Sequence, residues 1–239
     1  MTQTALLVFA RSAGMVFRAP GFAHPSVPAP VRAGFALALA LAVAPHVPVA
    51  RPFGAAAFAV AVAGETLLGA LLGTGAALLY DGAYYAGRLV DDYVGVRASV
   101  PTANVASAQA FGRLWSSVFL AGFFLLDGYV PVIGAFAQSF AHIPAGTLVA
   151  RDALLHVALA LPATIVRAAF AIAAPAIAVV LTVQIALAAV ARVVPRFASF
   201  SLAFPIVFAA ALLVTFAGVP LLAPAAAHPW LVLPWSSPP

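Results

Sequence analysis

Charged side chains are scarce throughout this chain, and their scarcity limits the folds that it can adopt. Only 7% of the 239 residues are charged, whereas 65% are hydrophobic. A typical soluble domain carries about 25% charged residues, because its core must be enclosed by a polar surface. The composition therefore excludes a soluble globular enzyme, and it excludes a disordered chain, which would be polar and charged. It indicates a polytopic membrane protein, or a subunit buried in a hydrophobic assembly.

The basic residues are spread singly between apolar runs. All eleven are arginine, and the formal net charge is +5. Proteins that bind nucleic acid concentrate such charge on one face or in one stretch, so we expect no nucleic-acid partner. Scattered arginines are typical of anchors at the membrane interface and of topology determinants. The chain has no cysteine, which excludes disulfides and thiolate metal sites.

Apolar runs and prolines together predict an all-α polytopic membrane protein with proline-broken helices. The first run is short for a membrane span, which needs about 20 residues. Two late runs are contiguous, and because proline interrupts helices we expect a sharp break near Pro175. We also expect one domain over 1–223 and an irregular proline-rich tail over 224–239. The expected runs are about 5–17, 31–49, 53–79, 114–126, 129–140, 151–174, 175–192 and 200–222.

Residues 80–109 form the polar centre of the chain. Four of the six acidic residues lie between Glu65 and Asp92. Bare charge at membrane depth is tolerated only beside protein or water, so this stretch is expected to be a loop or a re-entrant segment. For Asp91 and Asp92, a solvated loop is a better interpretation than a functional site.

Glu65 is the strongest single-residue candidate for function, because it is the only charge within the apolar run 53–79. A carboxylate at membrane depth is costly and usually faces a partner or a water-filled path. Two interpretations stay open: a residue that lines a channel or contacts a partner, and a structural ion pair with an arginine or a protonated buried acid. Arg11 and Arg167, which also lie in apolar runs, are better explained by pairing or snorkelling than by catalysis.

Two glycines follow Glu65 on the same run. Gly69 and Gly73 have the GxxxG spacing, which lets two helix backbones approach closely. In a chain rich in alanine and glycine this spacing also arises by chance.

Signatures of catalysis are absent from the sequence. It contains no HExxH, GxSxG, Walker A or GxGxxG motif, and no two histidines have the i, i+4 spacing of a metal site. Asp81-Gly82, followed by Asp91 and Asp92, superficially resembles the acidic signature of membrane CDP-alcohol phosphotransferases. The arginine of that signature and its later paired acids are missing, so we expect no enzyme and no cofactor.

A series of short motifs occurs in order along about 200 residues. It comprises Ala10-Arg11, Gly14, Ala19-Pro20 and Val31-Arg32, then Glu65-Thr66-Leu67-Leu68-Gly69, Ala86-Gly87 with Leu89-Val90-Asp91, Leu126-Asp127-Gly128-Tyr129, Ser139-Phe140, and finally Ala191-Arg192, Pro195, Phe200 and Phe204-Pro205. Their order and spacing resemble the FliR/SctT family, the R/T-type subunits of the type III secretion export gate. The chain departs from the family pattern at Arg88, Ala198 and Val207.

The resemblance implies a FliR-like subunit of the bacterial inner membrane that is built of hydrophobic helical hairpins and has no reaction chemistry. Such a subunit joins P-type and Q-type subunits and the large export-gate and switch proteins, in contact with membrane lipid. Together they form the portal through which unfolded secreted proteins enter the export apparatus. The implied pore or assembly residues are Glu65, Gly69, Gly73, Arg88, Asp91, Asp92, Arg97, Pro195, Phe200 and Pro205.

Two questions stay open from the sequence. Flagellar and injectisome branches of the family both fit, and Asp91-Asp92 slightly favours the injectisome branch. A second function, of another class, also fits the residues: a small-molecule or ion permease that uses Glu65.

Overall fold

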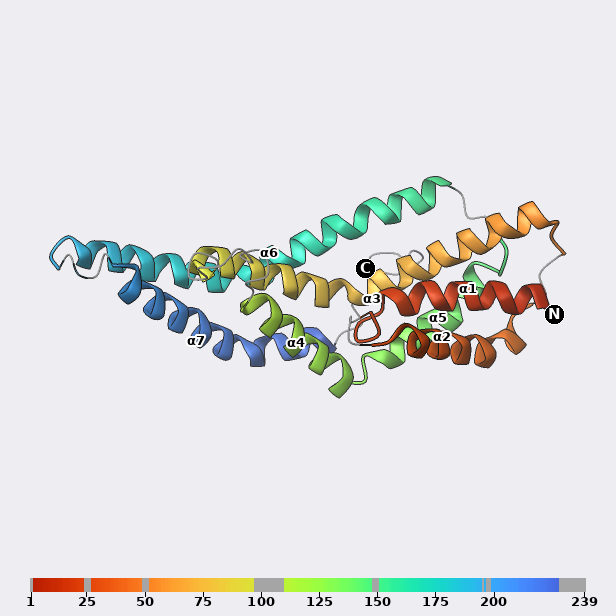
Figure 1. The fold of residues 1–239 in the computed structure, drawn as a ribbon, viewed down its shortest axis with the longest axis horizontal. Helices are drawn as coiled ribbons and strands as arrows, with labels where there is room; N and C mark the ends of the chain where they lie inside the picture. Colours follow the sequence, from red (N-terminus) through yellow and green to blue (C-terminus); the bar gives the residue numbers. More distant parts are fainter. Residues whose placement is uncertain are drawn as a thin grey trace. The chain divides into compact units, whose positions relative to one another are not determined.

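The computed structural model describes residues 2–23, 27–48, 52–96, 110–147, 151–194, 196 and 199–227. The regular elements within these ranges are all helical, and none is a strand, which confirms the all-α prediction (Figure 1). In chain order they are α1 (Thr2–Arg18), α2 (Ala29–Val43), the short 3-10 helix η1 (Ala44–His46), α3 (Ala55–Val94), α4 (Phe111–Leu125), α5 (Tyr129–His142), α6 (Arg151–Ala191) and α7 (Phe200–Ala227).

The chain divides into two compact units, and the long helices α3 and α6 contribute to both. The first unit takes in Met1–Leu78 and Phe123–Thr164, and the second takes in Leu79–Gly122 and Ile165–His228. Each unit has a hydrophobic core of its own, so each is described separately. A single domain over 1–223 stays a prediction.

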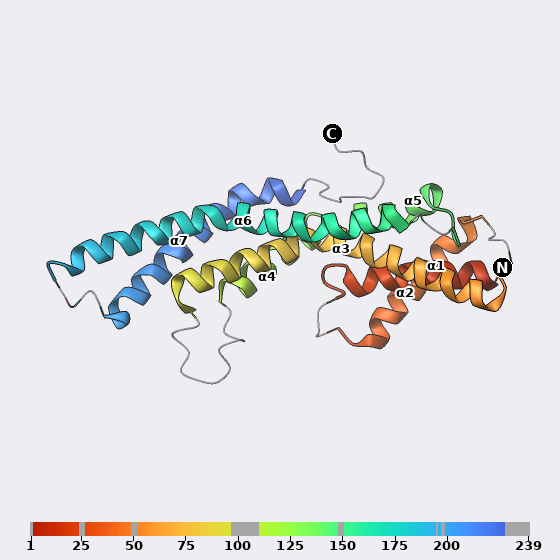
Figure 2. The same cartoon turned by 90° about the horizontal axis from the view of Figure 1, so that it is seen from above.

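In the first unit, α1, α2, the start of α3 and α5 pack around one core. Figures 1 and 2 show α1 lying along the first part of α3. Buried members of this core come from all four helices, for example Val8, Leu39, Leu72 and Phe136. The hydroxyl of Ser12 donates a hydrogen bond to the Ala36 carbonyl at 2.8 Å, which ties α1 to α2.

In the second unit, the end of α3 packs against α4, α6 and α7. The core combines small residues, which let the helices approach, with large aromatic side chains that fill the space between them. The ring centroids of Phe111 on α4 and Phe208 on α7 are 5.2 Å apart. Ala173 on α6 and Val207 on α7 are buried in the same cluster.

The polar centre is not a loop at its start. The prediction was wrong for residues 80–94, which continue α3 as a regular helix to Val94. This stretch contains no proline, and its apolar face, which includes Ala83, Ala86 and Val90, is buried in the second core. Packing of that face stabilises the helix, and the protein itself supplies partners for the polar groups. Residues 97–109 lie outside the described residues.

The break expected near Pro175 is also wrong. Helix α6 continues from Arg151 to Ala191 through both of its internal prolines. A proline removes one helical hydrogen bond, and helices in a membrane tolerate this because neighbouring groups compensate. Ala173 and Ala176, on either side of Pro175, are buried in the second core, so packing holds both halves of the helix. Helix α7 likewise continues to Ala227, into the segment expected to be irregular.

Four described segments are long and apolar enough to cross a membrane. They are Ala29–His46, Ala55–Val94, Ala158–Ala191 and Ser201–Gly218, and the bent pair α4 and α5 counts as a fifth if it forms one span. At most 28% of each of the four apolar windows is buried inside the chain. The remaining apolar surface is available to lipid or to other proteins, as in a polytopic membrane protein.

Candidate functional site

A buried ion pair joins α1 to α3 in the first unit. Nε of Arg11 lies 2.5 Å from Oε2 of Glu65, and Nη2 lies 3.1 Å from Oε1. The two side chains are only 1% and 2% exposed. The planar guanidinium therefore meets the carboxylate through two parallel hydrogen bonds, the strongest form of such a pair. Of the two interpretations of Glu65, the geometry supports the structural ion pair.

The remaining donors of Arg11 bind α5 and the turn that follows it. Nη1 donates to the hydroxyl of Ser139 at 2.8 Å, and Nη2 donates to the carbonyl of Ile143 at 2.9 Å. The guanidinium also lies 4.0 Å from the centroid of the Phe140 ring, within the range of a cation–π contact. Burying a charge is expensive unless its hydrogen bonds are made, and Arg11 meets that condition by contacting three elements at once.

Glu65 fixes the same turn from the other side. The backbone N–H of Gly146 donates a hydrogen bond to Oε1 of Glu65 at 2.8 Å. Gly146 has a φ of +81°, where a side chain is strained, and a Cβ there would lie 2.6 Å from the Phe53 ring. The ion pair is therefore part of what holds the turn at 143–146.

The glycines after Glu65 bring the backbones of α1 and α3 into contact. A Cβ added to Gly69 would overlap the carbonyl of Arg11, and one added to Gly14 would overlap the carbonyl of Thr66. Gly73 meets the last turn of α1 in the same way. The GxxxG prediction is therefore confirmed, and the close approach brings the two charged side chains within bonding distance.

In the second unit, Asp91 caps the N-terminus of α4. Its Oδ1 accepts hydrogen bonds from the N–H groups of Ala110 at 3.2 Å and Phe111 at 2.9 Å, and its Oδ2 accepts one from Gly112 at 3.2 Å. The first N–H groups of a helix have no partner within it and carry partial positive charge. The solvated-loop interpretation is wrong for Asp91, which is fully buried because α3 continues far enough to carry it to α4. Asp92, next to it, is exposed.

Arg88 lies beside the start of α4, and Gln184 lies beside the end of α3. Arg88 is half-buried, its guanidinium is 6.0 Å from the centroid of the Tyr84 ring, and its side chain lies against α4. Nε2 of Gln184 on α6 donates to the carbonyl of Tyr93, in the last turn of α3, at 2.7 Å. Sequence reasoning missed Gln184, although a lone amide within a long apolar run was a usable signal.

The structure groups the predicted site residues into two sets. Glu65, Gly69 and Gly73 come together against α1 in the first unit, whereas Arg88 and Asp91 lie beside α4 in the second. Ser139 and the 143–146 turn join the first set, and no pattern had singled them out as partners of the Arg11–Glu65 pair. Pro205 is exposed within α7, and Phe200 begins α7. Arg97 and Pro195 lie outside the described residues.

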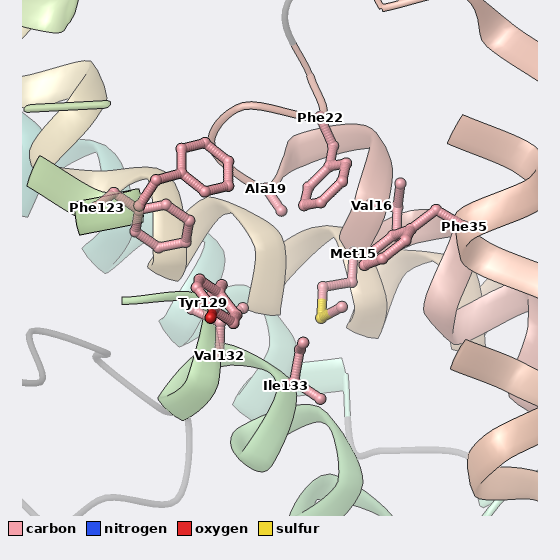
Figure 3. A pocket seen from close by; sticks show the side chains of 10 residues that line it. Met15, Val16, Ala19, Phe22, Phe35, Phe123, Tyr129, Val132 and Ile133 are labelled. Carbon is pink, nitrogen blue, oxygen red and sulfur yellow. The ribbon is translucent and has the colours of Figure 1, made fainter. Parts of the chain in front are cut away.

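An apolar pocket of about 360 Å³ opens beside the first core. Figure 3 shows the rings of Phe22 and Phe35 on one side of it and those of Phe123 and Tyr129 on the other. Phe22 and Phe35 are stacked, with centroids 4.3 Å apart. Tyr129 supplies the one hydroxyl of this lining, which has no set of groups for catalysis. Nor does any group of three His, Cys, Asp or Glu side chains that could hold a metal occur in the part of the chain that the structure describes.

The chain matches the family model described as "Bacterial export proteins, family 1" over residues 2–231. It belongs to this family. A relative within it, the flagellar biosynthetic protein FliR of Pectobacterium carotovorum subsp. carotovorum, is 26% identical over 227 residues, which cover 92% of this chain and 85% of the relative. The resemblance to FliR/SctT proteins is thereby confirmed.

Membership of the bacterial export family and the long apolar helices agree on where the protein acts. Together they identify a multi-pass protein of the bacterial inner membrane that takes part in protein export. The two polar sets described above are contacts between its own helices. In this export protein, the buried charges of Arg11, Glu65 and Asp91 all bond to groups of neighbouring helices or turns.

Proposed function

We propose that this protein is an export-gate subunit of a type III secretion apparatus, of flagellar or virulence type, and helps to form the portal through which unfolded substrates enter. The observation that carries the proposal is the family match over residues 2–231, together with a flagellar relative that aligns along 92% of the chain. Its partners in this proposal are the P-type and Q-type subunits and the large export-gate and switch proteins.

The apolar surface of α6 and α7 supports a protein that works inside an assembly. Ile185, Leu213 and Phe216 are 70–79% exposed, and α7 shows no polar face along its length. A helix that is hydrophobic all round is buried, either in a membrane or within a large protein assembly. Sister subunits would cover such surface as well as lipid does.

The polar contacts assign different tasks to the two units in this proposal. The Arg11–Glu65 pair holds the helices of the first unit in register for assembly. Asp91 holds the start of α4 against the end of α3, two helix ends that border residues 97–109 of the polar centre. We propose that the polar centre helps to constrict the pore.

The permease alternative is not favoured. A carboxylate that carries or selects a solute must be reachable from a path through the membrane. Glu65 is buried and engaged by both Arg11 and Gly146. The same geometry that suits a structural contact within the chain therefore counts against transport by Glu65.

Copurification tests the proposal directly. The tagged chain, expressed with the P-type and Q-type subunits of its own genome, should be recovered as a stable complex that contains all three. Deletion of the chain should abolish release of an export substrate into the medium, and the intact gene should restore it. A stable monomer that moves a small solute in liposomes would contradict the proposal and support the permease.

A further inference from the structure

Three polar side chains of helix α1 face the protein interior, while large apolar side chains of the same helix face outward. Thr4, Arg11 and Ser12 are at most 5% exposed, whereas Leu6 and Phe17 are 52% and 51% exposed. At 17 residues the helix is about 25 Å long, given a rise of 1.5 Å per residue, and the hydrocarbon core of a bilayer is about 30 Å thick. It is shorter than each of the described segments that are long and apolar enough to cross a membrane. These are features of a helix that docks onto others.

The partners of Arg11 lie far downstream in the chain. They are 54 positions away at Glu65, 128 at Ser139 and 132 at Ile143. The set is closed by Gly146, which donates to Glu65. The hydrogen bonds of Arg11 therefore cannot all form until the chain has been synthesised through this turn. A charged side chain at membrane depth is costly when it is unpaired, so α1 gains nothing by entering earlier.

We propose that α1 docks onto α3 only after α5 and the 143–146 turn are in place, and that the Arg11–Glu65 pair is the lock that holds it there. Before docking, Arg11 stays hydrated at the membrane surface. Docking buries both charges together, and the glycine contacts between α1 and α3 fix the one register in which they meet. Helix α1 is thus synthesised early but packed late. The Arg11–Glu65 pair decides whether α1 lies at the membrane surface or is docked onto α3.

The glycine contacts make this lock specific. Gly14 and Gly69 place each backbone directly against the other, so a shift of one helical turn would push side chains into the opposite backbone. The same shift would separate Arg11 from Glu65. The glycine contacts and the Arg11–Glu65 pair therefore favour the same register of α1 against α3.

The absence of cysteine from the chain makes a clean accessibility experiment possible. A reporter, Ala10→Cys, is placed on α1 beside Arg11, and a second reporter, Ala173→Cys, is placed in the core of the other unit; both positions are buried. Full-length chains in native membranes are treated with a membrane-impermeant maleimide, which reacts only with a thiol that reaches water as thiolate. Both reporters should be protected in the otherwise unchanged chain.

Glu65→Gln should release α1 alone. Labelling of Ala10→Cys should become at least about tenfold faster, because removing one partner of a buried ion pair is strongly destabilising, while Ala173→Cys stays protected. The double variant Arg11→Met, Glu65→Leu leaves no charge unpaired and should return labelling towards the original rate. Asp92→Asn, a similar change at an exposed site, should leave both reporters protected.

Three results would overturn the proposal. One is an unchanged labelling rate at Ala10→Cys in Glu65→Gln. Another is equal exposure of both reporters, which would mean that the pair stabilises the whole chain rather than the docking of α1. The third is a double variant that labels as fast as Glu65→Gln, which would mean that an unpaired Arg11 does not release the helix. None of these readouts depends on the proposed role in export.

Discussion

The backbone N–H of Phe111 donates a hydrogen bond to the carboxylate of Asp91 at 2.9 Å. The N–H groups on either side of Phe111 bond to the same carboxylate, so one side chain near the end of α3 satisfies the first donors of α4. On the other flank, Gln184 donates to the carbonyl of Tyr93. Side chains of the second unit therefore fix both helix ends that border residues 97–109.

Replacement of Asp91 should destabilise the start of α4. Asp91→Ala removes three hydrogen bonds and leaves buried N–H groups unpaired, at a cost of about 1–3 kcal/mol each when no water replaces the partner. We expect faster hydrogen exchange at Phe111 and Gly112 and a lower Tm in detergent. Asp91→Asn, which keeps an acceptor oxygen, should have a smaller effect.

Asp92→Ala is the matched control for this prediction, because Asp92 is the adjacent acid but is exposed. Exchange in α4 should stay close to that of the unchanged chain. Equal effects of Asp91→Ala and Asp92→Ala would mean that charge in this part of the chain matters, and capping does not.

The glycine contact between α1 and α3 yields a second prediction. Gly69→Ala adds a methyl group that overlaps the carbonyl of Arg11, and forcing extra volume into a packed contact costs about 1–3 kcal/mol. Gly64→Ala, five positions earlier on α3, enters open space. A lower Tm for Gly69→Ala and an unchanged or higher Tm for Gly64→Ala are expected. If the two variants had a similar Tm, the close contact between Gly69 and the α1 backbone would be contradicted.

The sequence predicted the all-α, polytopic character well, because long apolar runs leave few alternatives. It also identified Glu65, Gly69 and Gly73, since an isolated carboxylate and paired small residues stand out in an apolar run. It could not choose the partner of Glu65. Arg11 precedes it by 54 positions, and only tertiary packing brings the two together.

The errors have a common physical origin. Charges in residues 80–94 suggested a loop, and Pro175 suggested a break, because local rules treat polar groups and prolines as interruptions. In the fold, Asp91 bonds to the start of α4, and the residues beside Pro175 are buried in the second core. Tertiary contacts compensate for both interruptions, and local sequence does not reveal such contacts.

A third prediction concerns the indole of Trp115, whose Nε1 donates to the hydroxyl of Thr215 at 3.2 Å. Thr215→Val keeps the shape of the side chain but leaves the largely buried indole N–H without its acceptor, at a cost of about 1–3 kcal/mol. Thr215→Ser keeps the hydroxyl and should retain most of the stability. The Tm in detergent measures the loss of stability in each of the two variants.

Thr182→Val provides a control, because the hydroxyl of Thr182 is exposed and donates only to the carbonyl of Ala178 in its own helix. It should melt close to the unchanged chain. If Thr182→Val and Thr215→Val lower Tm equally, loss of any threonine hydroxyl in these helices would explain the result, and the indole bond would not.

A last prediction concerns the apolar pocket of the first unit. Ala19 is part of its lining (Figure 3), so Ala19→Leu can extend into open volume and bury more apolar surface, at about 25 cal/mol per Å². Ala76 is fully buried in the adjacent core and does not line the pocket, so Ala76→Leu must displace packed neighbours. We expect an unchanged or raised Tm for Ala19→Leu and a clearly lower Tm for Ala76→Leu. A loss of stability in both variants would mean that the pocket is filled or closed in the protein, since an open pocket has room for three more carbon atoms.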